Sequence, residues 1–145
     1  MNNLLVYWMP PLVWMIVISP LNGLFTAENT SSFIEPVLRW LFPFASSETV
    51  YVFHILIRKI SHFVEYALLS FLWFRAFRRG KKGIHWKWIA WAGCISIVYA
   101  GLDELLQAQI PTRTGAVLDW IIDSAGILCM LGSIGITVAI RKANA

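Results

Sequence analysis

Most residues that could bind a ligand or transfer a proton lie in two short stretches of an otherwise apolar chain. The longer stretch, 103–123, carries four carboxylates, an arginine and glutamine side chains between two long apolar segments. The shorter stretch, 59–66, opens a third apolar segment with a lysine, a histidine, a glutamate and a tyrosine. Because charges beside or inside bilayer-spanning helices are costly, they usually mark a functional site. The two stretches therefore predict a polar site in a membrane protein.

In three segments, polar residues recur three or four positions apart, which is the spacing that places side chains on one face of an α-helix. The three sets are His62 with Glu65 and Tyr66, Asp103 and Glu104 with Gln107, and Asp119 with Asp123. At a rise of about 1.5 Å per residue, they lie about 15 to 27 Å from the basic ends of their segments. The hydrocarbon core is about 30 Å thick, so all three sets fall in its outer half and we expect them to converge.

Such convergence would combine acids with bases, which suits proton transfer or the binding of an ion. His62 or Glu65 is the expected proton-transfer group, and the other acids would orient it or hold a cation. Arg113 lies in a tight loop shaped by Pro111 and Gly115, where its guanidinium could grip a phosphate or carboxylate through two parallel hydrogen bonds. The predicted catalytic residues are His62, Glu65, Asp103, Glu104, Asp119 and Asp123, and the predicted ligand-binding residues are Arg58, Lys59, Tyr66, Gln107 and Arg113.

Two other interpretations of these residues stay open. The acids and bases could form an ion-pair network that holds the outer ends of three helices together, because structural networks use the same residue types. The set also includes oxygen and nitrogen donors that suit a metal ion, although their spacing matches no standard metal site. His54 and His85 receive no role.

The composition puts the chain in the membrane class. Its 145 residues are 58% hydrophobic and only 14% charged, whereas a soluble domain carries roughly a quarter charged residues. The apolar residues form blocks close to the roughly 20 residues that a spanning helix needs. We therefore predict an all-α, polytopic bundle of four transmembrane helices in a single domain, 1–145, with spans at about 4–25, 58–77, 88–106 and 117–140. No pattern typical of nucleic-acid binding occurs, so we expect no nucleic-acid partner.

The distribution of charge predicts the orientation of the spans. Bases cluster after the second span and follow the last one, at Arg75, Arg78, Arg79, Lys81, Lys82, Lys87, Arg141 and Lys142. No acid falls in either region, and under the positive-inside rule both regions face the cytoplasm. Both termini are then cytoplasmic, and all eight acids belong to the outer half of the protein.

The longest connection, the outer loop 26–51, is expected to carry a short helix on the outer face of the bilayer. Ser32 and Glu35 have the spacing of a capping box, and Pro36 falls in the first turn, where its missing N–H is harmless. Apolar residues then recur at helical spacing, at Phe33, Val37, Trp40, Leu41 and Phe44. Such a helix could simply cover the bundle, or it could act as a lid over the site.

The polar stretches also carry a family resemblance. Its motifs are Lys59-x-x-His62-Phe63-x-Glu65-Tyr66, Asp103-Glu104-x-x-Gln107, Pro111-x-Arg113-x-Gly115 and Asp119-x-x-x-Asp123-x-x-Gly126. In these motifs, which cover roughly residues 58–140, the chain resembles the VanZ-like family of bacterial integral membrane proteins. The resemblance implies a small four-helix protein of the bacterial envelope, in a family whose named member is associated with low-level resistance to teicoplanin, a lipoglycopeptide that acts on the outer face.

We therefore expect a multi-pass protein of the bacterial cytoplasmic membrane with a polar pocket in the outer leaflet. The expected ligand is an envelope component, such as a lipid head group, a polyprenyl-linked precursor or the peptide end of a wall precursor. Arg113 and Lys59 would contact an anionic head group while the bundle holds an acyl or prenyl chain. The competing hypothesis is a structural or assembly protein whose polar cluster is an ion-pair staple. Proton-coupled transport is a third hypothesis, for which four helices are few. Catalysis, cofactor and oligomeric state stay open.

Overall fold

The structure, a computed structural model, describes residues 3–19, 27–109 and 117–144. Within these ranges the chain forms five α-helices and no strand, so the predicted all-α class is confirmed. The helices are α1 (Asn3–Ile18), α2 (Ala27–Leu41), α3 (Ser47–Arg78), α4 (Trp86–Gln107) and α5 (Val117–Ala143).

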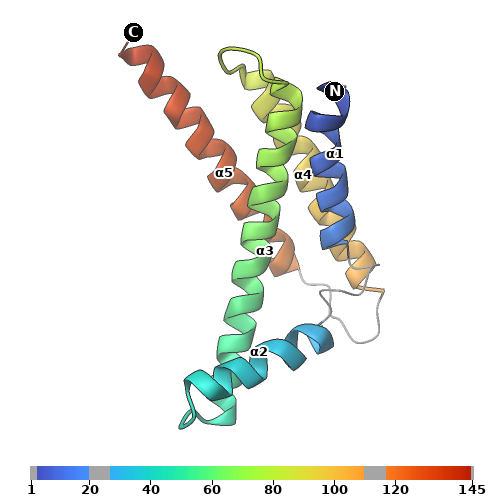
Figure 1. Cartoon of the computed structure of the whole chain (residues 1–145), viewed down its shortest axis with the longest axis vertical. Helices are drawn as coiled ribbons and strands as arrows, with labels where there is room; N and C mark the ends of the chain where they lie inside the picture. Colours follow the sequence, from blue (N-terminus) through green and yellow to red (C-terminus); the bar gives the residue numbers. More distant parts are fainter. Residues whose placement is uncertain (1–2, 20–26, 110–116, 145) are drawn as a thin grey trace.

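The longest helix, α3, runs the length of the molecule, with α1, α4 and α5 beside it (Figure 1). The start of α1, the α3–α4 connection and the end of α5 lie at one end, which we call the basic end. Helix α2 lies crosswise at the other end, beside the start of α3, which we call the α2 end. The predicted short helix in the outer loop is therefore present.

Helix α3 extends well beyond the predicted span of 58–77, because it begins at Ser47. The side chain of Ser46 caps it by accepting a hydrogen bond from the backbone N–H of Thr49 at 3.2 Å. It ends where Arg79 adopts a left-handed conformation with φ 48°. The prediction stopped at the charges of Arg58 and Lys59, where an apolar span would end. A helix that leaves the hydrocarbon core does not have to end there.

Helix α1 covers Asn3–Ile18, and the rest of the predicted first span, up to about residue 25, lies outside the described residues apart from Ser19. Helix α2 begins at Ala27 rather than at the capping box of Ser32. The outer loop, 26–51, therefore holds α2 and the first turn of α3. By contrast, α4 and α5 match the predicted spans of 88–106 and 117–140 to within three residues. Pro20 lies outside the described residues.

In the described residues, two helices are long and apolar enough to cross a membrane, over Trp86–Gln107 and Val117–Arg141. Helix α1 is apolar over Leu5–Ile18 but shorter, and polar side chains along α3 reduce its apolar content. Two of the four predicted spans thus meet this standard, and the complete four-span arrangement stays a prediction.

Small residues let α4 pack closely in the bundle. Its buried face carries Ala92, Gly93, Ser96 and Ala100 at helical spacing, a composition that allows helix backbones to approach one another. The same face continues into buried polar residues in the last two turns. Packing on one face of α4 therefore carries its polar groups into the bundle.

Helices α3 and α5 approach closely at Gly126. A Cβ atom there would collide with the backbone carbonyl of Phe63, so only glycine fits this position. Phe63 directly follows His62 and Gly126 lies about one turn after Asp123, so this contact determines how near the polar residues of the two helices come.

Candidate functional site

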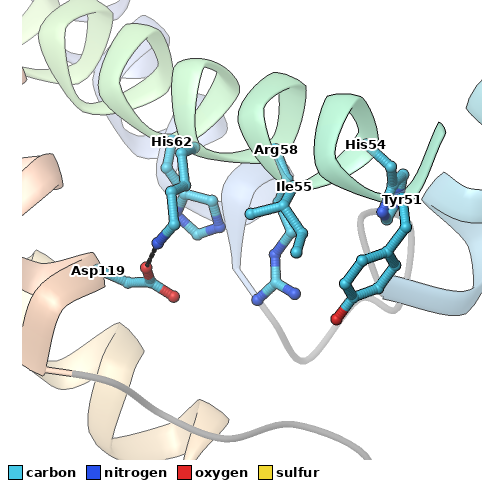
Figure 2. A pocket seen from close by; sticks show the side chains of 7 residues that line it. Tyr51, His54, Ile55, Arg58, His62 and Asp119 are labelled. Atoms are coloured by element: carbon cyan, nitrogen blue, oxygen red, sulfur yellow. Dashed lines mark hydrogen bonds and ion pairs between the residues drawn. The ribbon is translucent and has the colours of Figure 1, made fainter. Parts of the chain in front are cut away.

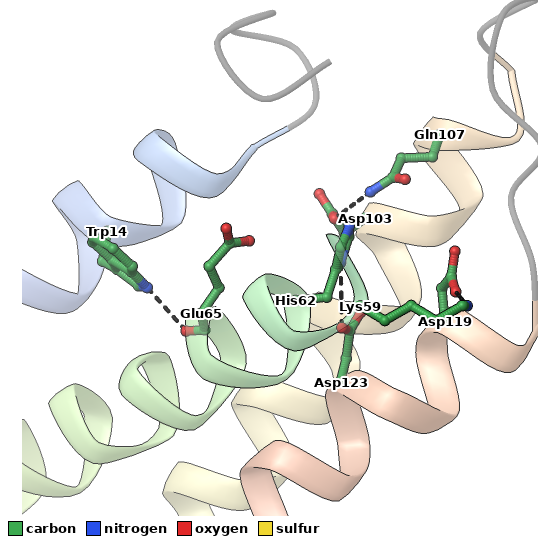
Figure 3. A network of polar contacts seen from close by, with 8 residues as sticks. All are labelled: Trp14, Lys59, His62, Glu65, Asp103, Gln107, Asp119 and Asp123. Carbon is green, nitrogen blue, oxygen red and sulfur yellow. Dashed lines mark hydrogen bonds and ion pairs between the residues drawn. The ribbon is translucent and has the colours of Figure 1, made fainter. Parts of the chain in front are cut away.

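One ion pair and one histidine–carboxylate contact join α3 to α5. The Nζ of Lys59 lies 2.7 Å from Oδ1 of Asp119, and Nδ1 of His62 lies 3.3 Å from Oδ1 of Asp123 (Figure 3). The two helices run in the same direction here, so residues about one turn apart on α3 meet residues one turn apart on α5. The predicted convergence of these two polar sets is confirmed.

Helix α4 adds Asp103 and Gln107 to the same cluster. The Nε2 of Gln107 donates a hydrogen bond of 2.8 Å to Oδ2 of Asp103, and both residues are buried. Tyr66 of α3 is also buried, and its hydroxyl lies near the Asp103 carboxylate without good hydrogen-bond geometry. Three helices therefore contribute polar groups to one buried region.

Several polar atoms in this region have no hydrogen-bond partner among the described residues. They include the hydroxyl of Tyr66, Oδ1 of Asp103 and Oδ2 of Asp123. Nδ1 of His62 and Oδ1 of Asp123 also lack a hydrogen bond of good geometry, despite their 3.3 Å contact. Buried polar atoms normally have a partner, and an exception at an internal cluster is typical of a functional site. These atoms could accept or donate a proton, or bind a polar group that enters from outside.

The remaining predicted acids are placed less centrally. The side chain of Glu65 points away from the pair formed by His62 and Asp123, and its backbone carbonyl accepts a hydrogen bond of 3.0 Å from Nε1 of Trp14 (Figure 3). Glu104 is buried on α4, and both glutamates take part in further interactions. Of the two groups expected to transfer protons, His62 is the one at the centre.

The loop with Pro111, Arg113 and Gly115 lies outside the described residues. The role of Arg113 stays a prediction.

A pocket of about 310 Å³ opens beside the cluster, between α3 and the start of α5 (Figure 2). Its lining residues are Tyr51, His54, Ile55, Arg58, Lys59, His62 and Asp119. The α3 residues recur every three or four positions, which puts them on one helix face. The guanidinium of Arg58 makes no ion pair or hydrogen bond with the described part of the chain.

Tyr51 and His54 are pocket residues that the sequence analysis missed. It assigned Tyr51 to the outer loop and gave His54 no role, because the predicted span began only near residue 58. The available signal was the continuation of the helical spacing backward from Arg58 through His54 to Tyr51.

The geometry indicates two chemical capacities. First, His62 lines the pocket and its Nδ1 lies 3.3 Å from the Asp123 carboxylate, an arrangement that suits proton transfer there. Second, the cations of Arg58 and Lys59 can receive an anionic group. No three His, Cys, Asp or Glu side chains in the described ranges stand close enough together to hold a metal ion.

Comparison with known families decides the affiliation. The profile of the family described as VanZ/LLP1 matches residues 5–138. The chain belongs to the VanZ/LLP1 family. The match confirms the resemblance carried by the motifs of 58–140 and extends it over α1 and α2. No curated protein and no solved structure matched the chain. Of the described residues in those motifs, Lys59, His62, Tyr66, Asp103, Gln107, Asp119 and Asp123 come together between α3, α4 and α5, whereas the Glu65 side chain points away.

Proposed function

We propose that this VanZ/LLP1 protein binds the anionic head group of an envelope lipid or lipid-linked wall precursor in the pocket between α3 and α5. The protein is multi-pass in the bacterial cytoplasmic membrane, with cytoplasmic termini and the pocket in the outer leaflet. Through this ligand it changes the tolerance of the cell to teicoplanin, the property that the family resemblance implies.

The guanidinium of Arg58, which has no ion pair or hydrogen bond with the described residues, carries this proposal. Lys59, its neighbour, already has Asp119 at 2.7 Å, whereas Arg58 meets no acid among the described residues although it lines the same pocket. A planar guanidinium binds phosphate and carboxylate groups through two parallel hydrogen bonds. A phosphate or carboxylate is therefore the ligand group that best complements this pocket.

The height of the pocket supports a head group as ligand. In α3, Arg78 lies 19 positions after Lys59, which is about 28 Å at 1.5 Å per residue. This length nearly equals the roughly 30 Å of the hydrocarbon core. If Arg78 is at the inner boundary, Arg58 and Lys59 are at the level of the outer head groups, where lipid phosphates lie.

The buried cluster behind the pocket could allow proton transfer to or from a bound ligand. A ligand held by Arg58 would lie beside His62, whose ring is oriented by Asp123. In this scheme His62 transfers a proton to or from the ligand, while Asp103 and Tyr66 complete the polar surroundings. Binding alone requires only the pocket, and catalysis would also require His62.

A structural role is the second candidate, because the pairs Lys59–Asp119 and His62–Asp123 tie α3 to α5. In that case the cluster is an ion-pair staple, and Arg58 is a solvated side chain. The two candidates differ in whether neutralising Arg58 abolishes ligand binding while the fold persists.

The decisive experiment measures retention of a polyprenyl phosphate, compared with the uncharged polyprenol of equal length, by native mass spectrometry of the purified chain. We expect the phosphate to be retained and Arg58→Gln to weaken its binding about tenfold or more, the effect of losing charge-assisted hydrogen bonds. Arg39→Gln is the matched control, because Arg39 is exposed on α2 and pairs with Glu35 within that helix. Equal binding by both variants would contradict the proposal.

In cells, the same variants are compared for teicoplanin tolerance, envelope lipids and muropeptides at matched protein level. The Arg58→Gln strain should resemble a strain without the protein, and the Arg39→Gln strain should resemble the wild type. A fully active Arg58→Gln protein would favour the structural role.

A further inference from the structure

A second pocket lies at the basic end of the molecule. It has a volume of about 520 Å³ and lies between the α3–α4 connection and the last turns of α5. Its lining residues are Arg78, Lys82, Gly83, Ile84, His85, Val138 and Arg141. None of them lines the first pocket, and the two pockets lie toward opposite ends of α3 (Figure 1).

The charge of this pocket is positive, and no acid among the described residues pairs with it. Arg78, Lys82 and Arg141 come from α3, the connection and α5, and none forms an ion pair with another described residue. The sequence has no acid between Glu65 and Asp103 and none after Asp123. A bound anion would compensate these charges.

The connection holds a defined shape around these bases. Gly80 and Gly83 have φ of 70° and 80°, which are favourable for glycine and allow the chain to turn tightly. The Nε of Arg78 donates a hydrogen bond of 3.0 Å to the carbonyl of Lys81. The guanidinium of Arg79 instead lies over the ring of Trp8, 5.3 Å from its centroid, and does not line the pocket. The turn thus separates bases that line the pocket from those that do not.

The lining is apolar as well as basic. Ile84 and Val138 contribute aliphatic surface, and the adjacent Trp86 is exposed and packs beside Gly135 of α5. Cations beside aliphatic surface and a tryptophan suit an amphiphile whose charged group and chain bind next to each other. A free phosphate ion would use only the basic part.

We propose that this second pocket binds the phosphate-bearing head group of an anionic phospholipid. The three bases hold the phosphate, and the acyl chains lie along the apolar surface beside Ile84 and Val138. The proposal is independent of the ligand in the first pocket, because the two sites share no residue.

The test is a titration of the purified full chain, in micelles of a neutral detergent, with dioleoylphosphatidylglycerol or dioleoylphosphatidylcholine, with bound lipid counted by native mass spectrometry. The pocket variant is Lys82→Gln/Arg141→Gln, which leaves Arg78 and its turn intact. The control is Lys81→Gln/Lys87→Gln, which removes the same charge from bases outside the pocket lining. Thermal unfolding without lipid checks that both variants fold.

We expect the wild type to retain phosphatidylglycerol in preference to phosphatidylcholine. The pocket variant should bind it about tenfold or more weakly, because each base near an anionic surface contributes about a fivefold factor. The control should stay within about twofold of the wild type. Equal losses in both variants, or no preference between the lipids, would overturn the proposal. Displacement of the lipid by low-millimolar inorganic phosphate would assign the pocket to a soluble phosphate and overturn the lipid assignment.

Discussion

Asp119 neutralises Lys59 at the edge of the first pocket, through a contact of 2.7 Å. We predict that Asp119→Asn tightens the binding of a polyprenyl phosphate severalfold, because it frees the ammonium group and removes a carboxylate that repels the ligand. The free energy of unfolding should fall by no more than about 1 kcal/mol, since the pair is partly exposed to solvent. Native mass spectrometry and thermal unfolding measure the two effects.

Glu35→Gln provides the control for this substitution, because Glu35 pairs with Arg39 on the exposed side of α2. It should change neither quantity by more than the error of measurement. Weaker ligand binding together with a large loss of stability in Asp119→Asn would favour the ion-pair staple.

A substitution at Asp103 can test the negative charge of the buried cluster separately from its hydrogen bonding. In Asp103→Asn the side-chain oxygen can still accept the hydrogen bond from Gln107, but the negative charge is gone. We predict that this variant folds with an unfolding free energy within about 1 kcal/mol of the wild type and has no cellular activity. Thermal stability in detergent and teicoplanin tolerance test this, and full activity would remove Asp103 from the proposed proton-transfer machinery.

The site was predictable in part from its residues. Helical spacing and the distance from the basic ends were sufficient to predict that His62, Asp103 and Asp123 would approach one another. Their pairing was not predictable, because it depends on how each helix is rotated about its axis, which side-chain packing decides. The same limit applies to Glu65, which shares the spacing of His62 but points away from Asp123 (Figure 3).

At the scale of the helices, the packing of α3 against α5 depends on the close contact at Gly126. We predict that Gly126→Ala destabilises the protein by about 1 to 3 kcal/mol or more, because the new methyl group would overlap the carbonyl of Phe63 and force the helices apart. Thermal unfolding of the purified protein measures the change. The separation should also lengthen the contact between Lys59 and Asp119.

Gly132→Ala is the matched control on the same helix, because nothing lies within 4 Å of the position that a Cβ atom would take there. Alanine favours a helix over glycine by about 0.5 to 1 kcal/mol, so this variant should be as stable as the wild type or slightly more stable. Similar stability in both variants would show that the close α3–α5 contact at Gly126 does not determine the stability of the protein.

The bounds of a helix were predictable where its apolar run extends over the whole helix. The spans of α4 and α5 were bounded closely, because their apolar runs end at polar residues near the helix ends. Helix α3 begins 11 residues before the predicted span (47 against 58), and its start was not predictable from hydrophobicity because the cap at Ser46 is a local hydrogen bond outside the apolar run. The start of α2 was missed because Ser32 fits a capping box by sequence, although it lies inside the helix.

On the scale of the whole molecule, the two ends differ in charge. Every acid of the chain lies outside the basic end, where the α3–α4 connection and the end of α5 are found (Figure 1). The length of α3, about 48 Å for 32 residues, exceeds the roughly 30 Å core. One end of this helix must therefore extend beyond the core. Positive charge disfavours transfer across the membrane, so the basic end is expected in the cytoplasm and the α2 end outside.

This orientation predicts the labelling of single cysteines in intact cells. In a background with Cys94 and Cys129 replaced by alanine, cysteines at Ser47 or Thr112 should react with a membrane-impermeant thiol reagent, whereas a cysteine at Lys81 should react only after the cells are permeabilised. Ser47 is exposed at the start of α3, and Lys81 is exposed in the α3–α4 connection. Labelling of the cysteine at Lys81 but not of the one at Ser47 in intact cells would show that the protein has the opposite orientation in the membrane. The pocket with Arg58 would then face the inner leaflet, where it could not meet an outer-leaflet precursor.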